Sequence, residues 1–275
     1  MKNFFIIVNA EKAMAGKTRH TIEAYLKNNK GVVSYTVWDG QKQDRYELPE
    51  GCDCIITIGG DGTLIQAARA TVGSKVPLIG INRGHMGYLT QLSDERMIVP
   101  ALKRLIDDDY TLEERMMLDA EVIRDGRSIY KEVALNEVML TRFNSIRTLN
   151  FQVYVNDKLL NEYSADGILA ATPTGSTAYS LSAGGPIAEP EARLIILTPI
   201  CSHAINSRSI IFSPKDRIKL IACSRQQVAA CDGESILNVE QGDEILIRMS
   251  KHSARFVRLR EESFLDTLRQ KMTFV

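Results

Sequence analysis

The stretch that most constrains this chain is Ile55–Leu64, an apolar run that leads into three glycines around one aspartate. Its β-branched start, Ile55–Ile58, predicts a strand buried on both faces. After the turn, Ile65–Ala70 predicts a helix. A glycine-rich turn between a strand and a helix exposes backbone N–H groups at the helix N-terminus, where anions such as phosphate bind. The stretch therefore predicts a phosphate-binding turn.

Asp61 is the unusual member of this turn, because a carboxylate repels phosphates. It needs another task, either holding a cation that neutralises them or taking a proton from an attacking hydroxyl. Both tasks belong to phosphoryl transfer. The alternative is a tight turn in which the Asp61 side chain caps the helix.

Composition indicates a globular protein with few of the usual signs of nucleic-acid or membrane binding. The 275 residues are 44% hydrophobic and 25% charged, and their formal net charge is +0. This balance argues against a nucleic-acid partner held by charge. No apolar run is long enough to span a membrane, and Phe4–Val8 predicts a first strand rather than a signal peptide. Five scattered cysteines without a histidine cluster favour reduced thiols and a cytoplasmic location.

The first part of the chain alternates strands and helices. Further strands are expected at Phe4–Val8, Val32–Trp38 and Val76–Ile81, and helices at Lys17–Lys27 and Ile98–Ile106. This pattern predicts a Rossmann-like parallel α/β domain over residues 1–115. A second glycine-rich turn, Asn82–Tyr88, follows the strand at Val76–Ile81. Ligands of open α/β sheets gather at such carboxyl ends of strands.

Short apolar runs separated by turn signals follow over residues 116–260. They predict an all-β domain, a β-sandwich, with Asp125-Gly126 and Asn156-Asp157 as hairpin turns. The expected strands are Val133–Thr141, Asn150–Val155, Ile168–Thr172, Leu194–Thr198, Ser209–Phe212, Ile218–Cys223, Gln227–Cys231, Glu244–Met249 and Arg255–Arg260. The tail 261–275 carries a predicted helix, Glu261–Met272. We expect its apolar face to return to the first domain.

The second dense motif is Ala165–Pro186, where a strand leads into a turn rich in small hydroxyl residues and ends at Gly-Gly-Pro. Such a segment suits a polar ligand such as a purine or ribose, and an ordinary loop with capping hydroxyls is the alternative. Asn136 and Glu137 interrupt an apolar strand and need polar partners. His203 is expected to be structural. Asp232-Gly233-Glu234 is expected to be a turn between strands.

Taken in order, these motifs resemble the bacterial NAD kinases. The resemblance extends from about residue 55 to about residue 235. It rests on Gly59–Thr63, Gly84–Thr90, Asn136-Glu137 and Asp166–Pro186. Lipid kinases and phosphofructokinases share the first motif, whereas the last motif together with Asn136-Glu137 is specific. The resemblance implies an α/β domain joined to a β-sandwich, with the C-terminal segment returning to the first domain.

The resemblance also implies an activity and the roles of individual residues. The enzyme would move the terminal phosphate of ATP, or of polyphosphate, to the 2′-hydroxyl of the adenosine ribose of NAD. Asp61 would be the base that takes the hydroxyl proton, Asn136 would contact adenine, Glu137 a ribose, and Asp166 the nicotinamide end. The other implied substrate contacts are Gly62, Arg147, Ser164, Thr174, Thr177, Ala178, Tyr179, Ser180, Leu181, Ser182 and Glu234, with Gly59, Gly60 and Thr63 forming the phosphate loop.

A divalent cation, Mg²⁺ or Mn²⁺, is expected on the donor phosphates rather than in a cage of protein ligands. The resemblance implies a homodimer or homotetramer. Two rival functions are a lipid kinase of the diacylglycerol type and a non-catalytic module that senses NAD. The choice between ATP and polyphosphate, the acceptance of NADH, feedback by NADP(H) and the roles of His203 and Asp232 stay open.

Overall fold

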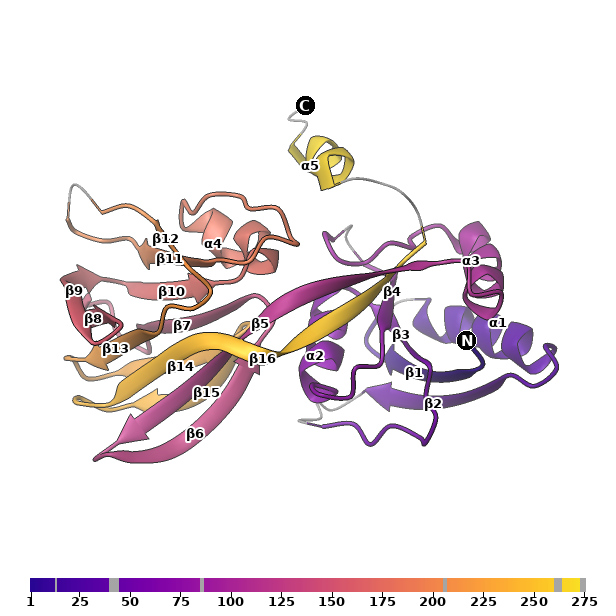
Figure 1. Cartoon of the computed structure of the whole chain (residues 1–275), viewed down its shortest axis with the longest axis horizontal. Helices are drawn as coiled ribbons and strands as arrows, with labels where there is room; N and C mark the ends of the chain where they lie inside the picture. Colours follow the sequence, from indigo (N-terminus) through magenta and orange to yellow (C-terminus); the bar gives the residue numbers. More distant parts are fainter. Residues whose placement is uncertain (13, 40–44, 85–86, 205–206, 260–263, 273–275) are drawn as a thin grey trace. The chain divides into compact units, whose positions relative to one another are not determined.

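The computed structural model describes residues 1–12, 14–39, 45–84, 87–204, 207–259 and 264–272 (Figure 1). Two compact units make up the chain. The first comprises Met1–Glu114 and Ser253–Val275, and the second comprises Arg115–His252. The sequence suggested boundaries at 115/116 and 260/261, so the observed return to the first unit begins inside the last strand rather than at the tail helix.

The first unit is a parallel sheet with helices on both faces. Its strands are β1 (Asn3–Asn9), β2 (Val33–Asp39), β3 (Cys54–Gly59) and β4 (Leu78–Asn82), in the order β2-β1-β3-β4. Its helices are α1 (Ala15–Lys27), α2 (Asp61–Ala70), η1 (Glu95–Met97), α3 (Ile98–Ile106) and α5 (Phe264–Met272). This arrangement confirms the predicted Rossmann-like α/β fold.

Both faces of this sheet are buried, which is why its strands are almost continuously apolar. On one face Phe4, Ile6 and Ile56 pack in a single cluster with residues of α1 and α3, which contact each other. The alternate side chains, such as Ile55, are equally buried, and α2 contacts β3 and β4. The helices thus exclude water from both sides of the strand that carries the first motif.

The second unit is a β-sandwich, as the sequence predicted. Its strands are β5 (Thr111–Arg124), β6 (Arg127–Ala134), β7 (Glu137–Arg142), β8 (Leu149–Val155), β9 (Lys158–Ala165), β10 (Gly167–Ala171), β11 (Ile195–Ile200), β12 (Ile210–Phe212), β13 (Ile218–Ala222), β14 (Gln227–Cys231), β15 (Glu234–Val239) and β16 (Glu244–Arg258). One sheet has the order β12-β11-β10-β7-β14-β15. The other includes β16-β13-β8-β9, with β5 pairing β16 and β6. Side chains from both sheets, including Leu140 and Phe151, form one core.

Three tight turns in this unit each connect the two strands of a hairpin. They resemble type I′ turns, because both central residues of each have positive φ. The φ values are 50° and 73° at Asp125-Gly126, 50° and 64° at Asn156-Asp157, and 52° and 80° at Asp232-Gly233. Asp, Asn and Gly tolerate this left-handed conformation best. The two hairpin turns and the turn at Asp232-Gly233 that the sequence predicted are therefore confirmed.

The second unit also corrects two strand predictions. The expected strand Val133–Thr141 is two strands, β6 and β7, with a bend at Leu135–Asn136. The expected pair Glu244–Met249 and Arg255–Arg260 is instead the single long strand β16. The periodicity of apolar residues does not show whether a segment is one strand or two. A chain that passes from one sheet to the other is apolar both before and after the bend.

The tail helix α5 belongs to the first unit, as expected, but its apolar face is not fully buried, because Leu265 is 71% exposed. The Lys271 ammonium lies 5.2 Å from the centroid of the Tyr88 ring, a cation–π distance within this unit. Among the described residues, no helix combines the length and the apolar character that a membrane span requires.

Candidate active site

Asp61 is the first residue of α2 and follows directly on β3 and the N-cap residue Gly60. The helix therefore begins before Ile65, where the sequence placed its start, and Gly62 and Thr63 are helical. Gly60 makes no side-chain cap, and the Asp61 carboxylate is hydrogen-bonded elsewhere. The capping alternative is thus not what the structure shows.

The Asp61 carboxylate accepts four hydrogen bonds from the loop that follows β4. One oxygen accepts from the backbone N–H of Tyr88 at 2.6 Å and of Leu89 at 3.2 Å. The other accepts from the backbone N–H of Thr90 at 3.0 Å and from its hydroxyl at 2.9 Å. Hydrogen bonds of this kind fix the orientation of the carboxylate. The first motif and the second glycine-rich turn therefore form one structure.

Behind Thr90, the amide of Asn82 donates to the Thr90 hydroxyl at 3.0 Å and accepts from Gly84 N at 2.7 Å. A Cβ on Gly87 would lie 2.0 Å from the Asp61 carboxylate, so only glycine fits there. Sequence reasoning missed Asn82 and Thr90 as partners of Asp61. The only indication in the sequence was that both residues follow the predicted strand Val76–Ile81, in or next to the second glycine-rich turn. His85 and Met86 of that turn lie outside the described residues.

The carboxyl ends of β1 and β3 meet at this site. The Asn9 amide at the end of β1 donates to the Thr63 hydroxyl at 3.2 Å, and a Cβ on Gly59 would come within 2.2 Å of that hydroxyl oxygen. In the order β2-β1-β3-β4, the strands β1 and β3 flank the point where the chain reverses its direction of winding. Open α/β sheets bind ligands at this point.

In the second unit, Asn136 and Glu137 lie where the chain leaves β6 in one sheet and enters β7 in the other. Both side chains are buried, with 8% and 6% of their surface exposed. Within the described part of the chain, neither Asn136 Oδ1 nor Glu137 Oε2 has a hydrogen-bond partner. Buried polar atoms without partners are costly, so this pair is suited to a polar ligand.

The environment of Glu137 raises its pKa to about 8, first through burial and then through the negative charge of Asp232. The cause is the cost of a charge in an apolar setting, increased by a like charge nearby. In the unfolded chain the pKa of this carboxyl is that of an ordinary glutamate. The folded protein therefore holds a proton on Glu137 at pH values where the unfolded chain has released it.

This pKa difference predicts a pH dependence of stability. Because the folded pKa is the higher one, stability falls as pH rises from about 4.5 to about 8 and then levels off. Glu137→Gln removes the ionisation, so its free energy of unfolding should gain roughly 2–4 kcal/mol relative to wild type between pH 5 and pH 9. Urea unfolding at the two pH values measures the difference. The exposed Glu191→Gln variant serves as the control, and a Glu137→Gln variant that tracks wild type at both pH values contradicts the prediction.

The hydroxyl-rich segment forms η2 (Thr174–Thr177) and α4 (Tyr179–Ser182). The Thr172 hydroxyl donates to Leu135 O at 2.6 Å, and the buried Arg115 guanidinium donates to the Thr174 hydroxyl at 3.1 Å. The Ser180 hydroxyl is fully buried and lies 3.4 Å from that of Thr198. The expected contacts at Tyr179, Leu181 and Ser182 are exposed, and those at Thr177 and Ala178 are half-buried. Only part of this segment is therefore open to a ligand.

The other expected contacts lie on the loops and strands around β9. Asp166, between β9 and β10, accepts from the Arg142 guanidinium at 2.9 Å. The Ser164 hydroxyl on β9 lies 3.3 Å from that of Thr148. Arg147 is exposed in the loop after β7, and Glu234 is the first residue of β15. Sequence reasoning missed Arg115 and Arg142, whose partners lie far away along the chain.

His203 is exposed, and its backbone N–H donates to Ser164 O at 3.0 Å. This contact belongs to its backbone and holds the loop to β9. Because the imidazole takes no part in this contact, the structural role expected for the His203 side chain stays a prediction.

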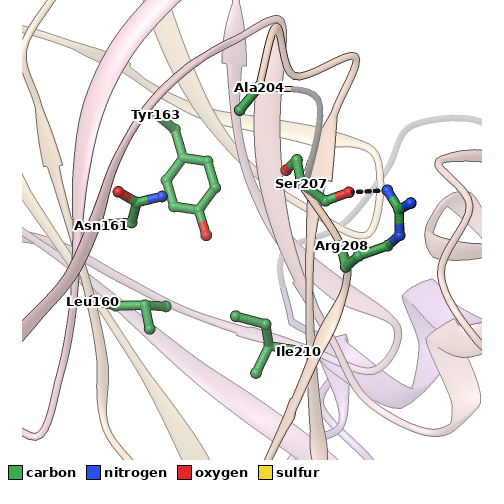
Figure 2. A pocket seen from close by; sticks show the side chains of 7 residues that line it. All are labelled: Leu160, Asn161, Tyr163, Ala204, Ser207, Arg208 and Ile210. Carbon is green, nitrogen blue, oxygen red and sulfur yellow. Dashed lines mark hydrogen bonds between the residues drawn. The ribbon is translucent and has the colours of Figure 1, made fainter.

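A separate pocket of about 280 Å³ lies between β9 and the segment before β12 (Figure 2). Figure 2 shows Leu160, Asn161 and Tyr163 on one side and Ser207 and Ile210 on the other, while the Arg208 guanidinium donates to Ser207 O at 2.9 Å. Burial raises the pKa of Tyr163. None of the site residues expected from the sequence lines this pocket.

The described part of the chain contains no cluster of three or more His, Cys, Asp or Glu side chains arranged to hold a metal ion. The Asp61 carboxylate is already bound by four protein donors. The described residues therefore fit a cation that is held chiefly by substrate phosphates, as is usual for Mg²⁺. They do not form a site in which protein ligands alone would hold a metal.

Comparison with known proteins finds the same relationship over both units. Residues 3–110 match the ATP-NAD kinase N-terminal domain, and residues 135–259 match the ATP-NAD kinase C-terminal domain. An NAD kinase of Lachnospira eligens is 40% identical, over 99% of this chain and 100% of its own. An NAD kinase of Acetivibrio thermocellus is 43% identical, over 80% of this chain and 77% of its own.

Solved structures agree on the fold. The yeast NADH kinase complexed with NADH has a TM-score of 0.83 at 24% identity, covering 98% of this chain and 86% of its own. The NAD kinase of Archaeoglobus fulgidus in complex with ATP has a TM-score of 0.76 at 24% identity, covering 98% of both chains. At this identity the likeness concerns the fold alone.

Proposed function

This chain belongs to the NAD kinase family, and we propose that it transfers the terminal phosphate of ATP to the 2′-hydroxyl of the adenosine ribose of NAD. The observation that carries the proposal is the buried pair Asn136 and Glu137, whose unpartnered polar atoms require a polar ligand. An amide oxygen accepts from the adenine amino group, and the carboxyl group of Glu137 exchanges hydrogen bonds with ribose hydroxyls. A dinucleotide supplies both kinds of partner.

Asp61 is the base in this proposal. A ribose hydroxyl is a poor nucleophile near neutral pH, so a base within about 2.6–3.2 Å of it accelerates the attack. The loop of Tyr88–Thr90 holds the carboxylate in one orientation, which favours a reaction that depends on alignment. Since both oxygens already accept two hydrogen bonds, the incoming hydroxyl takes the place of one of these donors. The Leu89 N–H, at 3.2 Å, is the longest of the four.

The other contacts expected from the family remain proposals for this chain. Asp166 would bind the nicotinamide end, oriented by its ion pair with Arg142. The exposed side chains of α4, together with Thr177 and Ala178, would cover the adenosine portion, while the buried Ser180 would hold α4 in place. The remaining proposed substrate contacts are Gly62, Arg147, Ser164, Thr174 and Glu234. The phosphates would bind to the loop of Gly59, Gly60 and Thr63.

A divalent cation, Mg²⁺ or Mn²⁺, would be held by the donor phosphates. When bound, such a cation neutralises the charge that develops on the transferred phosphoryl group. The residues of this chain would position the two substrates, and Asp61 would receive the proton. The choice of ATP over polyphosphate belongs to this proposal and is tested by varying the donor.

We also propose a cytoplasmic homo-oligomer. All five cysteines are free thiols, in keeping with a reducing compartment. The edge strands β9 and β12 expose large apolar side chains, with Leu159 52% and Ile211 56% exposed. Sheet edges of this kind are usually covered, and a second copy of the chain is the partner that the family resemblance favours.

Charging the β12 edge tests the oligomer. Ile211→Lys should lower the mass measured by light scattering during size-exclusion chromatography, because the side chain would place a charge in the apolar contact. The matched control is Ile146→Lys, since Ile146 is 95% exposed in a loop. A monomeric wild-type chain, or an Ile211→Lys variant with unchanged mass, argues against this interface.

The direct test of function is to incubate the purified chain with NAD, ATP and Mg²⁺ and to follow NADP with an NADP-specific dehydrogenase. Formation of NADP supports the proposal. NAD binding without NADP formation, with either ATP or polyphosphate, supports a sensor instead. Failure to bind NAD, together with phosphorylation of diacylglycerol, supports a lipid kinase.

A further inference from the structure

We propose that Asp232 is a positioning residue for the Asn136–Glu137 pair, and that it acts by holding the backbone of both residues. This inference rests on the proposed function, because it concerns how the pair binds NAD. Asp232 lies in the hairpin turn between β14 and β15, far from the pair in the sequence. The tertiary structure brings the two segments together.

The Asp232 carboxylate accepts from three consecutive backbone N–H groups. One oxygen accepts from Asn136 N at 2.7 Å and from Glu137 N at 3.0 Å, and the other accepts from Leu135 N at 2.8 Å. In return, Asp232 N donates to Glu137 O at 3.0 Å. These contacts form at the bend where the chain changes sheets, between the end of β6 at Ala134 and the start of β7 at Glu137.

The opposite side of the bend is held by the hydroxyl-rich segment. Asn136 O accepts from Thr172 N at 2.8 Å, and Leu135 O accepts from the Thr172 hydroxyl. Gly175 approaches so closely that a Cβ there would lie 2.2 Å from Asn136 O. The carbonyl side of the bend is thus fixed by Thr172 and Gly175, and the N–H side by Asp232. The direction of both buried side chains depends on these two supports.

The charge of Asp232 also acts on Glu137, whose unpartnered oxygen is buried beside it. Of the strands adjacent to Glu137, β10 carries no ionisable side chain and β14 carries only Cys231, and η2 carries none. Asp232 is the one charged group that contributes to the raised pKa of Glu137 among the described residues. Asp232 therefore affects both the orientation and the protonation of the side chain that we assign to the ribose.

The test is Asp232→Asn, which keeps the size of the side chain and removes its charge. Whichever way the amide turns, its NH₂ group faces at least one backbone N–H, so the bend loses a support. We expect kcat/KM for NAD to fall about 10- to 100-fold, mostly through KM, because the pair would be misplaced. The matched control is Asp125→Asn, an exposed residue of an Asp-Gly turn with nearly the same φ values, 50° and 73°. It should behave as wild type.

A pH profile separates positioning from a loss of stability. A limb of kcat/KM for NAD that Glu137→Gln abolishes reports the ionisation of Glu137. Removing the Asp232 charge lowers the pKa of Glu137, so this limb should move to lower pH in Asp232→Asn. If Asp232 only supported the fold, the folded fraction of the variant would show the change in kcat/KM at the same pH as the wild type.

The outcomes are distinct. The inference is overturned if Asp232→Asn leaves both the KM for NAD and the limb unchanged while the wild-type chain makes NADP. Should Asp232→Asn not fold, Asp232→Ser replaces it, because serine retains one acceptor oxygen. Failure of both variants to fold assigns Asp232 to stability alone and also overturns the inference. A wild-type chain that makes no NADP instead refutes the proposed function.

Discussion

Replacing Asp61 by asparagine is expected to lower kcat for NAD phosphorylation by about 10²- to 10⁴-fold, the usual contribution of a general base. The affinity for NAD should change little, because the expected contacts with adenine and ribose come from Asn136 and Glu137. Stopped-flow or coupled assays of NADP formation give kcat, and calorimetric titration with NAD gives Kd. Equal rates for the variant and the wild type would remove Asp61 from the mechanism.

The Asp61→Asn variant also changes the loop that holds the carboxylate. All four donors point at its two oxygens, so the amide NH₂ must face at least one N–H group. The expected cost is about 1–3 kcal/mol of stability. A second variant, Thr90→Val, separates the two effects because it removes the hydroxyl donor and leaves the carboxylate intact.

Thr90→Val should lower kcat far less than Asp61→Asn does. If the two variants lose activity equally, the orientation of the loop accounts for the effect, and the assignment of Asp61 as the base fails. The surface variant Asp107→Asn controls for the loss of a negative charge, since Asp107 is exposed and pairs with Lys103 within one helical turn.

Replacing Gly175 by alanine should disturb both stability and NAD binding. The added Cβ would lie 2.2 Å from Asn136 O, 2.5 Å from its carbonyl carbon and 2.8 Å from its Cα. All three are backbone atoms that cannot rotate away, so either η2 or the bend at Asn136 must move. Overpacking of this kind costs about 1–3 kcal/mol. The KM for NAD should rise as well, because the bend carries the pair that we assign to adenine and ribose.

Thermal unfolding and an NAD titration test the Gly175→Ala prediction together. For a chain of this size, each kcal/mol lowers Tm by about 2–4 °C. Gly16→Ala is the matched control, because Gly16 is in α1 and its added Cβ would meet nothing closer than 3.9 Å. The control should keep its NAD affinity and gain slightly in stability. Wild-type Tm and KM in Gly175→Ala would show that the segment adapts without cost.

The predictable parts of the fold came from local signals. An apolar run followed by Gly-Gly-Asp-Gly predicted β3, the turn and α2, because a strand buried on both faces is almost continuously apolar. Asp125-Gly126 and Asn156-Asp157 predicted hairpins, because few residues tolerate positive φ. The start of α2 and the single strand β16 were not predicted. A glycine-rich helix start resembles a turn, and a polar stretch within a long strand resembles a break.

The sequence by itself determined which residues carry the chemistry, because aspartate, asparagine and glutamate within apolar or glycine-rich surroundings need polar partners. Only the tertiary structure decided what those partners are. Asp61 is bound by Tyr88–Thr90, and Asn136 and Glu137 are held by Asp232. The physical reason is that hydrogen bonds depend on distance in space. Two segments far apart in the chain meet only when the strands that carry them pair.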